Sequence, residues 1–187
     1  MPSKQLFDRP FNCQSWQGIE ETARYGETSG CKFDQYAISL GPGQDIFNIA
    51  VERLFNYKIY PSERMMARVC SPEGRVIKGC IIVQRIFLGL VGFEAAVRVV
   101  DVFDIQDQEK RKTGYSYVTL KGHPESGVVT FSVEQRKGSE NILLVIESWS
   151  KPGNLFAVLF RPIARFIQKK TSDQALLSFK NGVVHEN

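Results

Sequence analysis

The sequence predicts an α+β fold in which a long C-terminal helix packs on a curved antiparallel sheet of about six or seven strands. Two observations predict it. Residues 65–150 contain successive strand-like runs separated by short turns, which leave no room for the crossover helices that parallel strands require. After Pro152 the pattern changes, and apolar residues recur at helical spacing.

The first predicted element is a short strand at residues 36–40, which Gly41-Pro42-Gly43 ends. Asp45 then serves as the N-cap of a helix whose apolar stripe continues to Tyr57 and which should stop before Pro61. Six further strands are predicted at residues 65–70, 76–84, 90–102, 113–120, 128–135 and 142–150. Turn residues between them fit an antiparallel meander.

The last predicted element is a helix at residues 154–179, about 39 Å long and able to cross the whole sheet. Pro162 lies inside it and cannot donate a hydrogen bond to Val158, so we expect a kink or a restart there. One face of the sheet would be solvated. The other would pack on the helix, leaving a space that either fills with side chains or stays open as a ligand cavity.

This order of elements is that of a helix-grip fold, similar to the START lipid-transfer domains and the birch-pollen-allergen family. Such proteins often bind hydrophobic small molecules, an expectation that rests on analogy of fold. A chain of 187 residues with 43% hydrophobic residues suffices for one substantial core. We therefore expect an irregular segment packed on the domain at residues 1–35, the helix-grip domain at residues 36–182, and a tail at residues 183–187.

The net charge of +4 is too small to indicate a nucleic-acid partner. All of the excess lies in the last 37 residues, which hold six Lys or Arg and two Asp or Glu. There, Arg161, Arg165, Lys169 and Lys170 form a basic stripe on the predicted helix. The stripe is either an ordinary solvated face or a weak contact for anionic lipid or a phosphate-bearing partner.

Cysteine spacing and hydropathy exclude several classes of protein. Cys13, Cys31, Cys70 and Cys80 form no C-x-x-C pair and have no histidine at zinc-site spacing, so neither a metal nor a cofactor is expected. The longest uncharged apolar run, residues 86–93, is far shorter than the roughly 20 residues of a membrane span. The N-terminal residues show no apolar signal segment. A cytoplasmic protein is the expectation.

The stretch Gly122-His123-Pro124-Glu125 admits two interpretations. In one, His123 acts as a general acid or base near neutral pH with Glu125 orienting it. In the other, the stretch is a tight turn between two strands, and the ring packs or caps a carbonyl. We favour the turn because the nearby sequence offers no nucleophile and no oxyanion-hole motif. No catalytic residue is assigned on this basis.

Five side chains are predicted ligand contacts. Glu94 and Arg98 share one face of a long strand and would orient a ligand if that face is concave, or would decorate the surface if it is solvated. Tyr115 and Tyr117 share a face and either anchor a ligand by their hydroxyls or form a packed pair. Glu147 lies among apolar residues and either contacts a ligand or sits at an exposed strand end.

Several short motifs resemble a known family. Gly41-x-Gly43, Arg98-Val99-Val100, the pattern T-L-x-G-H-P-E-x-G at residues 119–127 and Ser150-Lys151-Pro152 are similar to an uncharacterised family of bacteria and plants known only as a domain of unknown function. The resemblance extends from about residue 36 onward. It implies a helix-grip fold and no established activity. Val128 stands where the family commonly has Glu, which argues against any mechanism needing that carboxylate.

Together these features predict a protein that binds a hydrophobic or amphipathic small molecule between the sheet and the C-terminal helix. Two alternatives stay open: an enzyme of the same fold that uses His123 with Glu125, and an interaction protein with a filled core. The sequence indicates neither the identity of the ligand nor an oligomeric state.

Overall fold

The computed structural model describes residues 8–11, 30–88, 91–152 and 161–186, with side chains in the last helix placed from Asp173 onward. Within these residues, seven strands form one antiparallel sheet in the order β1-β7-β6-β5-β4-β3-β2. The strands are β1 (Lys32–Pro42), β2 (Met65–Cys70), β3 (Ile81–Leu88), β4 (Val91–Gln106), β5 (Lys110–Thr119), β6 (Glu125–Arg136) and β7 (Asn141–Pro152). The predicted antiparallel α+β sheet is confirmed.

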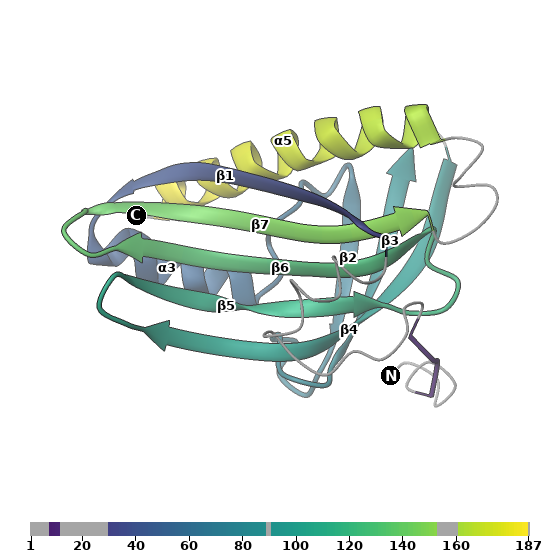
Figure 1. The fold of residues 1–187 in the computed structure, drawn as a ribbon, viewed down its shortest axis with the longest axis horizontal. Coiled ribbons are helices and arrows are strands. Elements are labelled where there is room, and N and C mark those ends of the chain that lie inside the picture. The colour runs from purple at the N-terminus through teal and green to yellow at the C-terminus, as the bar shows by residue number, and fades with distance from the viewer. Residues whose placement is uncertain (1–7, 12–29, 89–90, 153–160, 187) are drawn as a thin grey trace.

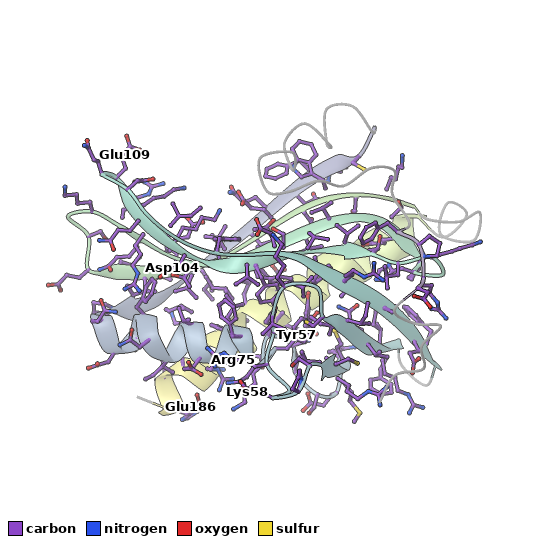
Figure 2. The ribbon with its side chains drawn as sticks, turned by 90° about the horizontal axis from the view of Figure 1, so that it is seen from below. Tyr57, Lys58, Arg75, Asp104, Glu109 and Glu186 are labelled. Carbon is purple, nitrogen blue, oxygen red and sulfur yellow. The ribbon has the colours of Figure 1, made fainter. Side chains whose placement is uncertain are left out.

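Both helices of the described chain, α3 (Gln44–Phe55) and α5 (Arg161–Glu186), lie on the same side of the curved sheet (Figures 1 and 2). Gly43, rather than Asp45, is the residue that caps α3, and Asp45 lies in the first turn of that helix. Pro162 is the second residue of α5, a position where its missing N–H costs no helical hydrogen bond. The predicted helical residues 154–160 lie outside the described residues. At its other end α5 continues to Glu186.

The C-terminal end of α5 is attached to the end of α3. Glu186 forms ion pairs with Arg53, at 2.5 Å, and with Lys58, at 3.8 Å. The guanidinium of Arg53 also lies 5.7 Å from the centre of the Phe179 ring. Gly182 leaves the space that Arg53 occupies, because a Cβ there would lie 2.0 Å from the guanidinium. Figure 2 shows Lys58 and Glu186 together at this junction.

The main core lies between the helices and the inner face of the sheet, the face that the helices cover. Side chains on alternate positions of the strands supply it, as the period of two requires. They include Val97 and Val99 of β4 before an irregularity in the pairing with β5, and Val102 after it. Phe47 and Leu54 of α3 are buried against them.

The sequence predicts that the outer face of the sheet is solvated, but part of this face is buried in the structure. Val118, Val128 and Leu120 are fully buried there. Phe11 packs against the two clusters to which these residues belong and forms a β-bridge with Leu120. Next to that bridge, the amide of Lys121 donates a hydrogen bond of 2.9 Å to the carbonyl of Pro10. Part of the N-terminal segment therefore covers this face of the sheet.

Candidate functional site

Polar side chains gather at one place on the inner, mostly apolar, face of the sheet. Gln84 of β3 lies two residues beyond the core residue Ile82 and is 1% exposed. Tyr117 of β5 is buried on the same face, and Tyr57 and Tyr60 come from the segment that follows α3. We call Tyr57, Tyr60, Gln84 and Tyr117 the inner polar cluster.

Tyr57 reaches the cluster because of the way in which α3 ends. The amide of Tyr57 donates to the carbonyl of Leu54 and the amide of Lys58 donates to that of Arg53, both at 3.0 Å. This is the Schellman pattern, in which glycine usually occupies the left-handed position. Here Tyr57 occupies it, with φ of 55°. A bulky residue in this conformation costs about 1 kcal/mol or more, and it places the Tyr57 ring in the interior (Figure 2).

Hydrogen bonds connect the members of the inner polar cluster. The amide of Gln84 donates to the hydroxyl of Tyr57 at 2.6 Å. Tyr117 is hydrogen-bonded to Gln84, Tyr57 and Tyr60, which partly offsets the burial that raises the pKa of Tyr117 to about 12. Burial also raises the pKa of Tyr57 and of Tyr60 well above the ordinary value. The three hydroxyls are therefore neutral at physiological pH and can both donate and accept hydrogen bonds.

Glu125 opens β6 on the same face and lies beside the cluster. Its charge raises the pKa of both Tyr60 and Tyr117, which places its carboxyl near their hydroxyls. Burial, and secondarily the charge of Asp34 on β1, raises the pKa of Glu125 itself. Burial likewise raises the pKa of Asp34. Glu125 thus lies on the inner face near the hydroxyls of Tyr60 and Tyr117, and Asp34 lies near Glu125.

His123 belongs to the turn that leads into β6. Its amide donates to the carbonyl of Leu120 at 3.0 Å, and Gly122 takes a φ of 97°, as in a type II turn. The ring is 8% exposed, and its Nδ1 lies 3.0 Å from both the amide nitrogen and the carbonyl oxygen of Glu125. Burial lowers the pKa of His123 to about 4. The neutral ring therefore holds the backbone of Glu125.

Tyr115 lies next to the inner polar cluster. The ring is fully buried, with ring centres 5.6 Å from Phe131, 5.8 Å from Phe55 and 6.4 Å from Tyr57. Its hydroxyl has no hydrogen-bond partner in the part of the chain that the structure describes. The structure thus brings the predicted contacts Tyr115 and Tyr117 together on the inner face.

The other predicted ligand contacts lie on the outer face. Glu94 is exposed, and Ala96, which shares its face, packs with the outer-face residue Leu120. The guanidinium of Arg98 lies 5.2 Å from the centre of the Phe11 ring. Glu147 accepts hydrogen bonds from Gln35, at 3.0 Å, and Lys112, at 3.2 Å. The sheet therefore separates Glu94, Arg98 and Glu147 from the inner polar cluster.

Lys112 joins two carboxylates on the outer face. Its ammonium lies 3.0 Å from Glu134 and 3.2 Å from Glu147, and all three side chains are largely buried. Burial would lower the pKa of Lys112, but the two carboxylates outweigh it and raise the pKa. Burial would raise the pKa of Glu134, but Lys112 outweighs it and lowers that pKa below 4.5.

We expect Lys112→Met to lower the free energy of unfolding at pH 7 by about 1 to 2 kcal/mol, because Glu134 and Glu147 then face each other without a cation. A lowered folded-state pKa stabilises the fold above the unfolded value of 4.5, and this contribution disappears as the pH falls. Urea unfolding at pH 7 and pH 4 should therefore show the deficit of the variant shrinking in acid. Lys78→Met, which removes the exposed ion pair with Asp101, is the control, and equal losses in both variants would contradict this account.

Some predicted features fall outside what the structure describes. The side chains of Arg161, Arg165, Lys169 and Lys170 lie outside the described residues, although the backbone of α5 includes them. Among the described residues, no three His, Cys, Asp or Glu side chains converge as metal ligands would. None of the helices in the described ranges is long and apolar enough to cross a membrane.

Sequence patterns alone did not identify Tyr57, Tyr60, Gln84 and Asp34 as site residues. A signal for Gln84 was present, because it is an isolated polar residue at an inner position of an apolar strand. The sequence pattern assigns Tyr57 to the apolar stripe of α3, and only the left-handed helix end turns it inward. Asp34 lies in β1 before the start predicted for that strand, so its face could not be inferred.

The curved antiparallel sheet, the long C-terminal helix and the interior polar cluster define an α+β protein whose architecture agrees with a helix-grip fold. The chain belongs to the family described as Domain of unknown function (DUF1990), whose model matches residues 18–177. The resemblance to a family of unknown function is thereby confirmed. No curated protein matches the sequence.

Solved structures share the fold at low sequence identity. A hypothetical protein of Helicobacter pylori has a TM-score of 0.55 and 10% identity, covering 92% of this chain and 96% of that one. Ara h 8.0201 has a TM-score of 0.54 and 11% identity, covering 83% and 99%. Norcoclaurine synthase of Thalictrum flavum, solved with dopamine and hydroxybenzaldehyde, has a TM-score of 0.51 and 11% identity, covering 92% and 95%. These similarities show the fold.

Proposed function

We propose that the protein binds a hydrophobic or amphipathic small molecule between the inner face of the sheet and α5. The polar end of this molecule contacts the inner polar cluster, and Glu125 lies beside it. One observation carries the proposal: a hydrogen-bonded group of hydroxyl and amide side chains is buried on a helix-covered face that is mostly apolar. A few convergent polar groups in an apolar surrounding are typical of small-molecule sites.

The energetics of the cluster support this proposal. Polar groups buried without hydrogen bonds are costly, so an apolar side chain at position 84 or 117 would give a simpler core. The left-handed Tyr57 adds backbone strain at the same place. The structure of norcoclaurine synthase with two small aromatic molecules is an example of a protein with this fold that binds such ligands.

Among the predicted contacts, we assign Tyr115 and Tyr117 to this site. The hydroxyl of Tyr115 is buried without a partner among the described residues, so it is a group that a ligand oxygen would satisfy. Glu94, Arg98 and Glu147 are given no ligand contact, because they lie on the outer face. They provide matched control positions instead.

Native mass spectrometry of freshly purified protein tests the proposal. The wild-type protein should carry an apolar molecule at near-stoichiometric occupancy, which organic extraction then identifies. Tyr117→Phe removes one hydroxyl without changing the ring, and we expect the affinity for that molecule to fall about fivefold, equivalent to about 1 kcal/mol. Glu94→Gln on the outer face should leave the affinity unchanged.

Two results would contradict the proposal. One is equal weakening by the Tyr117 and Glu94 variants, since this would remove the distinction between the faces. The other is a wild-type protein that purifies empty and whose melting temperature no lipid or metabolite mixture raises. The second result would favour an interaction protein with a filled core.

A further inference from the structure

A cleft of about 490 Å³ lies between α5 and the turn that connects α3 to β2. Pro61, Glu63 and Arg64 line it from the turn, and Gln174, Leu177 and Ser178 line it from α5. The turn is held in place on both sides. The amide of Arg64 donates to the carbonyl of Pro61, and the carbonyl of Arg64 accepts from the amide of Phe87, both at 2.9 Å. The wall of the cleft is thus fixed by backbone hydrogen bonds.

Arg64 supplies an available positive charge in this cleft. Its side chain is half-buried, and it makes no hydrogen bond, ion pair or aromatic contact in the part of the chain that the structure describes. The arginines of neighbouring elements differ, since Arg53 and Arg75 each form an ion pair at 2.5 Å. A guanidinium binds a carboxylate through two parallel hydrogen bonds, so a ligand carboxylate suits Arg64.

Gln174 supplies a hydrogen-bond acceptor that needs a donor. Its side-chain carbonyl oxygen is buried and has no partner among the described residues. Leaving such an acceptor unsatisfied costs about 1 to 3 kcal/mol. Ser178 lies one helical turn further along the same face of α5, and its hydroxyl adds a second polar group. Gln174 lines the cleft, so a rotation of its side-chain amide would turn this oxygen toward the cleft, where a hydroxyl or amino group of the ligand would satisfy it.

The remaining walls define the rest of the ligand. Leu177 is 55% exposed and, with Pro61, offers an apolar surface. Glu63 is an exposed carboxylate beside Arg64, so it opposes a doubly charged anion such as phosphate and favours a ligand that also carries a positive charge. The volume lies in the range of ordinary small-molecule sites.

We propose that this cleft is a second binding site, which takes a small carboxylic acid bearing an amino or hydroxyl group and an apolar side chain. The carboxylate pairs with Arg64, the amino or hydroxyl group donates to Gln174, and the apolar side chain lies on Leu177. The proposal concerns a different surface from the inner polar cluster and does not depend on a ligand there.

Titration of the ¹⁵N-labelled protein with three related probes tests the site. Leucine and 2-hydroxy-4-methylpentanoate carry both the carboxylate and a donor, whereas 4-methylpentanoate lacks the donor. We expect saturable shifts of the amide resonances of Leu177 and Ser178 with the first two probes, and binding of 4-methylpentanoate at least about tenfold weaker. Tighter binding of leucine than of the hydroxy acid would support the proposal and would indicate that the ammonium group of leucine also pairs with Glu63.

Arg64→Gln should weaken leucine binding about tenfold or more, because the charge-assisted bond is lost. Arg68→Gln, which changes an exposed arginine on β2 outside the cleft, should have no effect. The proposal would be overturned by the absence of a saturable shift with leucine up to about 20 mM, far above typical ligand affinities, by equal binding to the Arg64 variant, or by equal binding of 4-methylpentanoate. Shifts centred on Tyr117 instead of α5 would also overturn it.

Discussion

Replacing Gly114 with alanine is expected to lower the free energy of unfolding by about 4 kcal/mol or more, which places it among the most damaging single substitutions. Gly114 lies in the interior of β5, paired with Phe103 on one side and Ser132 on the other. A Cβ at this position would lie 2.0 Å from the carbonyl oxygen of Phe131 and 2.9 Å from the Cα of Ser132. Both are backbone atoms of the neighbouring strand.

The cost is large because the clash cannot be relieved by a side-chain rotation. Moving β6 away from β5 would break the hydrogen bonds of the ladder and disturb Phe131, which is fully buried in the main core. Gly127 of β6 has the same relation to β7, since a Cβ there would lie 2.2 Å from the carbonyl oxygen of Trp149. Glycines inside strands permit such close backbone approach where a sheet bends.

Urea unfolding of Gly114→Ala, followed by circular dichroism, measures the effect. Gly138→Ala is the control, because Gly138 lies in the β6–β7 turn with φ of 78° and would place its Cβ in open space. That variant should lose about 1 kcal/mol through its backbone conformation alone. A loss at Gly114 no larger than the loss at Gly138 would show that steric contact between strands is not what requires glycine there.

The fold could be predicted from the sequence because its signals are local. Turn residues between β-branched runs define the meander, and the change to helical spacing after Pro152 defines α5. The faces of the sheet could not be predicted in the same way. Alternation shows that Glu94 and Arg98 share a face, but Val118 and Val128 on the outer face are as apolar as inner residues. These two residues are buried in part because Phe11, which is distant in the sequence, packs against them.

In the candidate site, too, the residues that follow from local spacing could be predicted and the others could not. Tyr115 and Tyr117 were identifiable because two residues of one strand separated by one position must share a face. The cluster also needs Tyr57, whose direction depends on a left-handed residue at the end of α3. The sequence places His123 and Glu125 together and leaves two interpretations open: an acid or base that Glu125 orients, and the favoured one, a turn in which the ring packs or caps a carbonyl. In the structure the ring binds the backbone of Glu125.

That arrangement gives the stability of the protein a specific dependence on pH. The pKa of His123 is about 4 in the folded state and 6.5 when the residue is unconstrained. Because the folded-state pKa is lowered, the contribution of the neutral ring is complete above pH 6.5 and is lost as the pH falls from 6.5 through 4. The full loss in the free energy of unfolding amounts to about 3 kcal/mol, because in this pH range His123 binds a proton in the unfolded chain but not when it is buried in the fold.

The difference in stability between His123→Gln and the wild type should change sign with pH. At pH 7 the variant should be about 1 kcal/mol less stable than the wild type, because the ring no longer holds the backbone of Glu125. At pH 4.5 the variant should be the more stable protein, since it carries no buried imidazole to protonate. Carboxylates titrate in the same range in both proteins, so their effects cancel in the difference.

His185→Gln, at an exposed position of α5, is the control and should show no such change of sign. A constant difference between wild type and the His123 variant from pH 7 to 4.5 would mean that the imidazole takes up its proton in the fold as readily as in water, and the turn would then not bury it.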